Sequence, residues 1–215
     1  MKKTSLLITI LIIYSLNIAL SPAHAIEWQN TIGGNDGDNL NSIQQTTDGG
    51  YILGGYSESG ISGDKTESSQ GKNDYWVVKL DGTGQNIEWQ NTIGGSDTEV
   101  LSSVQETTDG GYILGGYSQS EISGDKTEAS NGERDYWVVK LDATGQNIEW
   151  QNTIGGSDSE YLNSIRQTAD GGYILGGYSY SGISGDKIET NQGESDYWVV
   201  KLDGTGQNIE WQNTI

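Results

Sequence analysis

The chain has 215 residues, 30 of them acidic and 11 of them Lys or Arg, and a net charge of −19. Its only His, Pro and Met are His24, Pro22 and Met1, and it contains no Cys. Beyond residue 25 there is therefore no imidazole or thiol for a Ser-His-Asp or Cys-His nucleophile, or for a zinc site of the usual kind. The negative field also argues against nucleic acid and anionic lipid as partners.

Residues 1–25 have the pattern of a secretory signal. Two lysines precede an apolar stretch from Ser5 to Leu20, and the sequence AHA that ends at Ala25 offers small residues for cleavage. We expect cleavage near Ala25 and a secreted or periplasmic product. The apolar stretch is shorter than the roughly 20 residues that a bilayer span requires, and no later stretch is continuously apolar, so we expect no membrane span.

The sequence after residue 25 is a tandem repeat with a period of 61 residues, because the heptapeptide IEWQNTI begins at Ile26, Ile87, Ile148 and Ile209. The segments between these copies repeat in step. We therefore divide the chain into a signal peptide and a repeat domain. The repeat domain spans residues 26–215, with full repeats at 26–86, 87–147 and 148–208 and a partial copy at 209–215.

Each period predicts four β-strands, because four segments rich in Tyr, Trp, Val and Ile lie between clusters of Gly, Asp and Asn. In the first period these segments are Leu40–Thr46, Tyr51–Ser57, Asp74–Leu80 and Ile87–Ile93. Short turns at 47–50 and 81–86 predict antiparallel neighbours. Both faces of the third segment are apolar, whereas the fourth alternates apolar and polar residues, which indicates an outer strand with one face in water.

A four-stranded antiparallel sheet that buries both faces and recurs in tandem is the unit of a β-propeller. We therefore predict an all-β, β-propeller-type array of three four-stranded antiparallel blades with one extra N-terminal strand. The sequences LDGTGQNIEW and LDATGQNIEW resemble the Trp-docking turn of quinoprotein-type propeller blades, in which a Trp packs between blades. The whole unit is also similar to tandem repeats of exported bacterial propeller proteins. This resemblance leaves function open, since propellers serve as enzymes, lectins and scaffolds.

Two connections in each repeat are expected to meet at one end of the sheets, and both are acidic. The connection from the outer strand to the next inner strand carries Asp36, Asp38, Asp97, Glu99, Asp158 and Glu160. The long connection between the second and third strands carries Glu58, Asp64, Glu67, Asp125, Glu128, Glu133, Asp186, Glu189 and Glu194. The sequence thus predicts an acidic loop face. The repeats also differ most in these loops, which is where binding sites usually lie on a fixed scaffold.

The tetrapeptide SGDK is the same in all three long connections and indicates a defined turn. In one interpretation its Asp caps the turn through bonds to the backbone. In the other, this Asp and the Glu three residues later bind calcium. The residues of the calcium hypothesis are Asp64, Glu67, Asp125, Glu128, Asp186 and Glu189.

These features favour a secreted, non-enzymatic binding or scaffold module that recognises a protein or carbohydrate ligand through its acidic loop face. The alternative is a carbohydrate-active or quinone-dependent enzyme, although equivalent acids in every repeat leave no single pair distinguished as acid and base. A third interpretation is a fragment of a longer propeller protein. Five tyrosines could stack on sugars, although buried or rim packing is the favoured interpretation for most of them: Tyr56, Tyr117, Tyr161, Tyr178 and Tyr180. Tyr161 and Tyr180 occur in one repeat only, so we expect them to be the more exposed.

Both ends of the repeat array carry a copy of IEWQNTI, at Ile26 and at Ile209. In a closed ring the two copies would compete for one outer-strand position, and a propeller ring generally requires at least about four blades. We therefore expect the isolated chain to self-associate, most simply as a dimer, or to remain an open array that exposes apolar sheet faces.

Overall fold

The computed structural model describes residues 28–215, so the predicted signal peptide lies outside the described residues. The described part of the chain is all-β, and no helix in it is long and apolar enough to cross a membrane. The strands are β1 (Asp38–Gln45), β2 (Tyr51–Ser57), β3 (Asp74–Leu80), β4 (Ile87–Ile93), β5 (Glu99–Glu106), β6 (Tyr112–Ser118), β7 (Asp135–Leu141), β8 (Ile148–Ile154), β9 (Glu160–Gln167), β10 (Tyr173–Ser179), β11 (Asp196–Leu202) and β12 (Ile209–Thr214).

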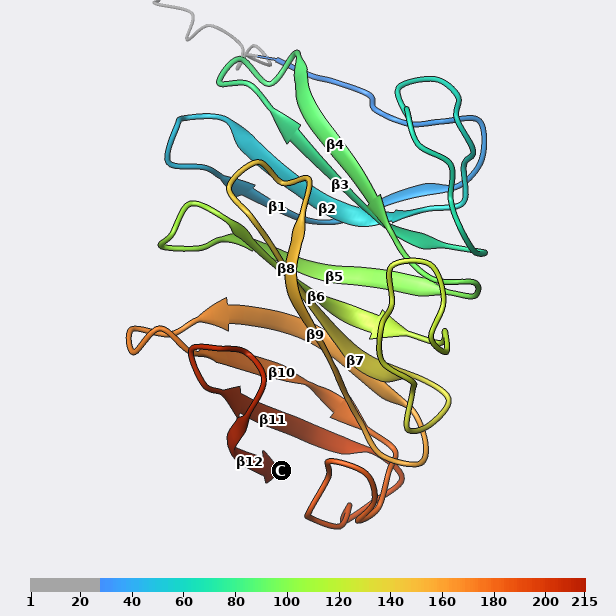
Figure 1. Ribbon diagram of the computed structural model, residues 1–215, viewed down its shortest axis with the longest axis vertical. Coiled ribbons are helices and arrows are strands. Elements are labelled where there is room, and N and C mark those ends of the chain that lie inside the picture. The colour runs from blue at the N-terminus through green and yellow to red at the C-terminus, as the bar shows by residue number, and fades with distance from the viewer. Residues whose placement is uncertain (1–27) are drawn as a thin grey trace, which may run out of the picture.

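The strands form three four-stranded antiparallel sheets, each made of strands that are consecutive in the chain: β1 to β4, β5 to β8 and β9 to β12 (Figure 1). The predicted propeller-type array of three blades is thus confirmed, but the expected extra N-terminal strand is not formed by residues 28–32. In the first sheet, three strands match the predicted segments residue for residue. The first strand begins at Asp38 instead of Leu40, because Asp38 pairs with Ser57 and the ladder extends along the whole of β2.

The two hairpin turns of each sheet are built from Asp and Gly, as predicted. In the first turn Gly49 has a φ of +88°, and the Asp48 carboxylate accepts a bond from the Gly50 amide at 2.9 Å. In the second turn Gly84 has a φ of +70°, and Asp81 accepts a bond from the Asn86 side chain at 2.7 Å. A positive φ is available to Gly at little cost, so these residues fix the strand pairing.

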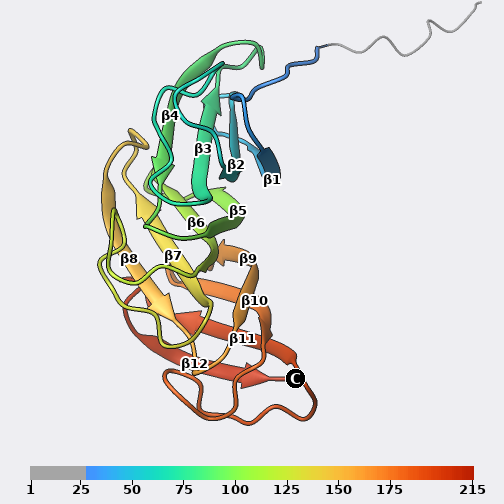
Figure 2. The same cartoon turned by 90° about the vertical axis from the view of Figure 1, so that its right-hand side faces the viewer.

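The sheets stack face to face in a curved, open arc (Figure 2). Leu101 and Val104 of β5 pack on the bare backbone of Gly54 in β2, where a Cβ atom would lie 2.8 Å from Leu101 Cδ2. The buried core at this junction also contains Tyr75 from the first sheet and Trp137 from the second. The bare backbone of Gly54 therefore leaves room for aliphatic side chains of the neighbouring sheet, whereas Gly55 faces the backbone of Asn39 in its own sheet.

The Trp residues of the two internal IEWQNTI copies pack against the following sheet. The ring centroids of Trp89 and Tyr112 are 5.3 Å apart, and those of Trp150 and Tyr173 are also 5.3 Å apart. Trp211 of β12 has no following sheet in the described residues and is 50% exposed. The prediction that these indoles pack on an adjacent sheet is thus confirmed for the two that have one.

Candidate functional site

The two acidic connections of each repeat do meet at one end of the sheets. The Asp64 amide donates to the Gly33 carbonyl at 2.9 Å, and the Gly33 amide donates to the Asp64 carboxylate at 3.1 Å. Asp125 and Asp186 make the same two bonds to Gly94 and Gly155. The side chain therefore joins the long connection to the loop that leaves the preceding outer strand, and we refer to this end of the sheets as the loop face.

The invariance of SGDK follows from the contacts of its Lys. Lys126 is buried, and its Nζ donates to the Glu128 carbonyl at 2.5 Å. In the first repeat Lys65 makes the equivalent bond and also donates to Thr92 Oγ1 of β4 at 2.8 Å. Burial lowers the pKa of both lysines. Lys65 and Lys187 thus tie the loop to the outer strand of their sheet, through Thr92 and Thr214, whereas Lys126 bonds only within its loop. All three lysines are buried, so they are not available to a ligand.

The acids of the calcium hypothesis are held by backbone amides. Glu67 Oε2 accepts a bond from the Thr92 amide at 2.7 Å, and Glu128 and Glu189 accept equivalent bonds from Thr153 and Thr214 at 2.6 Å. Within residues 28–215 no three acidic, His or Cys side chains lie together in a group that could hold a metal ion. The Glu bonds run to the outer strand and the Asp64 carboxylate bonds to Gly33 in the other connection, so these acids link separate segments and do not cap the SGDK turn itself. Calcium binding stays a prediction that would need carbonyl or water oxygens as further ligands.

The expected acidic rim is only partly at the surface. Asp36, Glu58 and Asp158 are exposed, but Glu99 and Glu160 are fully buried at the junctions between sheets. Assigning these two acids to the exposed rim was wrong. Each begins the inner strand of its sheet and accepts a bond from the amide of a glycine four residues earlier, as Glu160 does from Gly156 at 2.8 Å.

Each buried Glu faces a buried Asp from the preceding sheet. Burial and, to a smaller extent, the nearby Glu160 raise the pKa of Asp135 to about 7, although bonds from the Asn131 and Gly132 amides oppose the shift. In the preceding junction, burial and the nearby Glu99 likewise raise the pKa of Asp74 to about 6, against opposing bonds from the Gln70 and Gly71 amides. These pairs are enclosed by the sheets, so they act on stability and are not open to a substrate.

A cluster of aromatic rings on the loop face breaks the repeat symmetry. Tyr161 at the start of β9 stacks on Tyr178 at the end of β10, with ring centroids 4.9 Å apart and planes tilted by 16°. Tyr117 from the neighbouring sheet packs edge-on at 5.0 Å, and Tyr180 at 6.3 Å. The Arg134 guanidinium lies 5.4 Å from the Tyr161 ring centroid. We call these five residues the tyrosine cluster.

Sequence reasoning identified the tyrosines of this cluster but missed Arg134. The available signal was that Asn73 and Ser195 occupy the same repeat position, so Arg134 is unique, as are Tyr161 and Tyr180. Tyr180 is 38% exposed, and the other three rings are partly buried. No model of a protein family matches the sequence, and a search of curated proteins gives no match.

Proposed function

We propose that the protein is a secreted, non-enzymatic binding module that takes a carbohydrate ligand on its loop face. The observation that carries this proposal is the tyrosine cluster, because it is built from residues that the repeat itself does not require. The residues equivalent to Tyr161 are Asn39 in the first repeat and Val100 in the second. The repeat therefore does not need a tyrosine at this position to form its sheet.

The chemistry of the cluster suits a sugar. Tyrosine rings offer apolar faces on which the C–H groups of a pyranose can pack, and their hydroxyl groups can bond to the hydroxyls of the sugar. Arg134 lies across two of the rings, at 5.9 Å from Tyr117 and 5.4 Å from Tyr161, and fixes their positions. Exposed carboxylates around the cluster disfavour anionic polysaccharides, so the proposed ligand is an uncharged glycan.

The proposal of a binding role, and not of an enzyme, rests on where the paired acids lie. Glycoside hydrolysis needs two carboxyl groups with different pKa values on either side of a bound sugar. Asp135 and Glu160 are neighbouring carboxyl groups, but both are fully buried between the sheets, where no sugar can reach them. A carbohydrate-active enzyme would have to use exposed acids, and its activity would appear as release of reducing ends from the glycan.

The test uses the repeat as its own control. Tyr161→Val and Tyr180→Gln replace the two unique tyrosines by the residues at the same positions in the second repeat. Affinity electrophoresis of the mature protein against soluble xylan, mixed-linkage β-glucan and glycol chitin should show retardation by at least one of them. The double variant should lose it. Ile188→Thr, which restores the sister residue at another exposed apolar position, should keep it.

Two outcomes would contradict the proposal. Absence of retardation by all three glycans, or retardation that the double variant retains in full, would remove the tyrosine cluster as a sugar site. Release of reducing ends from a glycan would replace the binding role by the enzymatic alternative.

A further inference from the structure

The two junctions between sheets use a pair of complementary faces. The Gly face of a sheet carries the mid-strand glycine that receives the neighbouring side chains. The Leu face carries the two aliphatic residues of the inner strand that pack on that glycine. At the second junction Leu162 and Ile165 pack on Gly115, where a Cβ would lie 2.7 Å from Leu162 Cδ2. The first junction repeats this with Leu101, Val104 and Gly54.

A buried tyrosine forms a hydrogen bond across each of these junctions. Tyr75 lies on the Gly face of the first sheet, and its hydroxyl donates to the Trp137 carbonyl of the second sheet at 3.0 Å. Tyr136 donates in the same way to the Trp198 carbonyl of the third sheet at 3.1 Å. Both tyrosines are fully buried. A junction therefore requires a tyrosine and a glycine on one sheet and two aliphatic residues on the next.

The first and third sheets each have one face that no other described sheet covers. One is a Leu face and the other a Gly face, so together they have the residues of a further junction. On the first sheet the Leu face is open, and Leu40 and Ile43 are 58% and 54% exposed. On the third sheet the Gly face is open: Tyr197 is 70% exposed, and a Cβ on Gly176 would meet no atom within 4 Å. Each half lacks the partner that its counterparts have inside the array.

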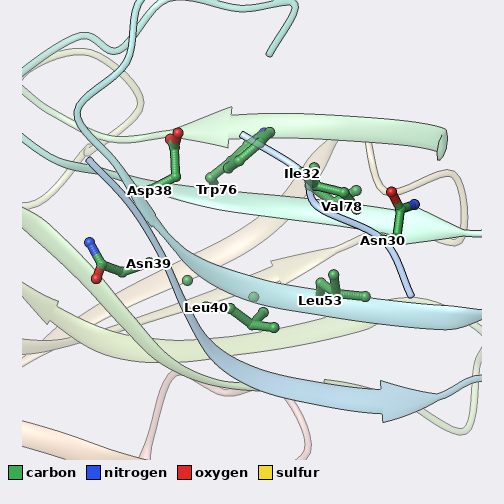
Figure 3. A pocket seen from close by; sticks show the side chains of 10 residues that line it. Asn30, Ile32, Asp38, Asn39, Leu40, Leu53, Trp76 and Val78 are labelled. Carbon is green, nitrogen blue, oxygen red and sulfur yellow. The ribbon is translucent and has the colours of Figure 1, made fainter. Parts of the chain in front are cut away.

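The open Leu face has a groove where the tyrosine of a preceding sheet would sit. The groove has a volume of about 210 Å³ and is lined by residues that include Ile32, Leu40, Leu53, Trp76 and Val78 (Figure 3). Trp76 is the repeat equivalent of Trp137 and Trp198, whose carbonyls accept the tyrosine bonds. The groove thus offers the same backbone acceptor and apolar walls as the internal junctions.

We propose that a second copy of this chain docks head to tail, with its third sheet on the open Leu face of the first sheet. Tyr197 of one copy enters the groove and donates to the Trp76 carbonyl of the other, and Leu40 and Ile43 pack on Gly176. The occupant is a copy of the chain because both halves of the junction are present on it. Such a contact is heterologous, so it builds rings or open filaments.

The N-terminal copy of IEWQNTI opposes this docking. The Trp28 ring lies 5.5 Å from Tyr51, and the Asn30 side chain donates to the Gly84 carbonyl at 3.1 Å. Trp89 and Asn91 make the same contacts with Tyr112 and Gly145. Residues 28–32 therefore occupy the site that β12 of an incoming copy would need.

The competing segment is weakly held. Residues 28–32 belong to no strand ladder, so they are fixed only by side chains such as Trp28, Asn30 and Ile32. A segment without backbone pairing opens at low cost. We infer that it acts as a displaceable plug, and that its removal increases the population able to associate.

Sedimentation velocity on the mature chain, at concentrations from 1 to about 200 μM, tests the proposal. Removing residues 26–32 should lower the dissociation constant for self-association roughly tenfold or more. If the truncated chain fails to fold, Trp28→Ala gives the same test. Leu40→Asp in the truncated chain should abolish association. Ile188→Asp changes an equally exposed apolar residue off both faces and should leave it intact.

The head-to-tail geometry can be tested by disulfide cross-linking. The chain contains no Cys, so only introduced cysteines can form a disulfide. At the internal junctions the glycine Cβ position lies 3.1 Å from the Cβ of Val104 or Ile165, close to the separation of a disulfide. Ile43→Cys and Gly176→Cys chains should cross-link when mixed under mild oxidation, and neither should do so alone. A monomer at all concentrations after truncation, or equal cross-linking of the single variants alone, would overturn the proposal.

Discussion

At the scale of single residues, the paired carboxyl groups between sheets are the most unusual feature. Asp135 Oδ1 is buried and has no hydrogen-bond donor within the described residues. Its neighbour Glu160 is equally buried. Two carboxylates brought together away from water repel one another, so Asp135 keeps its proton to a higher pH than an isolated carboxyl group does. The junction between sheets is thus sensitive to protonation.

This pair predicts that stability falls as pH rises towards neutrality. The folded-state pKa of Asp135 is raised from 3.8 to about 7, so the folded chain binds more protons than the unfolded chain between those values. The stabilisation is fully present below about pH 4 and is lost as pH rises through about 7. The melting temperature should therefore decrease between pH 5 and pH 8. Asp135→Asn should flatten this dependence.

The exposed Glu133→Gln serves as the control for the pH experiment, because it removes an acid of the same connection without touching the buried pair. Its melting temperature should follow the wild-type pH dependence. A slope that Asp135→Asn leaves unchanged would show that other groups cause it.

The calcium hypothesis makes a prediction at the same scale. Asp125 uses Oδ2 for bonds from the Gly94 amide and the Gln70 side chain, which leaves Oδ1 for an ion. Calcium that binds only the folded state must raise the melting temperature by mass action. Thermal melts in 5 mM calcium and in chelator should then differ by roughly 2 °C or more. Asp125→Asn should reduce this difference, and an unchanged response would exclude that loop.

At the scale of elements, the bare backbone in the second strand of each sheet decides how closely the next sheet approaches. Gly115 and Gly176 have the same sequence context, but only Gly115 is covered by a following sheet. The internal and outer sheets are thus a matched pair in one molecule. Replacing each glycine by Ala changes the strand in the same way, but only at Gly115 does the methyl group enter the space between two sheets. The difference in unfolding free energy between the two variants therefore measures the cost of filling that space.

Gly115→Ala should destabilise the fold by about 1–3 kcal/mol, because the new methyl group would strike Leu162 and Ile165 at 2.7 and 2.8 Å. Gly176→Ala should change stability by no more than about 0.5 kcal/mol, since its Cβ meets nothing within 4 Å. Urea unfolding of the monomeric protein measures both. Equal costs would mean that the strand conformation, and not the packing between sheets, requires glycine.

The outer strands give a second matched pair. Trp150 packs on Tyr173 and covers Gly206 in the following turn, whereas Trp211 is 50% exposed. Trp150→Ala should cost about 3 kcal/mol of unfolding free energy, and Trp211→Ala less than about 1 kcal/mol. Unfolding followed by circular dichroism avoids the loss of a fluorescent reporter. A large effect of Trp211→Ala in the monomer would contradict the exposed position of its ring.

At the scale of the whole molecule, charge and open apolar faces oppose one another. The net charge of −19 includes two lysines and no acid from residues 1–25, so the repeat domain is more negative still. Like-charged copies repel over the Debye length, which is about 30 Å in 10 mM salt and about 8 Å in 150 mM salt. Docking of two copies therefore has to overcome a repulsion that depends on ionic strength.

Self-association should consequently strengthen with added salt. Raising the salt concentration from 10 to 150 mM should lower the dissociation constant of the plug-deleted chain several-fold, because repulsion is screened while apolar burial is not. Light scattering across a salt series measures this. Association that weakens with salt would indicate attractive ionic contacts, which the proposed junction does not contain.

The sequence by itself determined the strands and their pairing. Periodicity in IEWQNTI and DYWVVKLD and the Asp-Gly turns fix which residues alternate between faces, and these are local properties of the chain. Three of the four predicted strands in the first sheet have the predicted bounds for this reason. The contact between the two acidic connections followed from the same topology, since antiparallel neighbours bring those loops to one end.

Only the tertiary structure decided which acids are buried, which tyrosines gather and which faces stay open. Glu99 looks like a loop acid in sequence, yet the neighbouring sheet removes it from water. Arg134 lies 17 residues from Tyr117 and 27 residues from Tyr161 in the sequence, and no local pattern specifies that these side chains meet. Burial and clustering depend on how one sheet lies on the next, and identical repeats acquire different surroundings according to their place in the array.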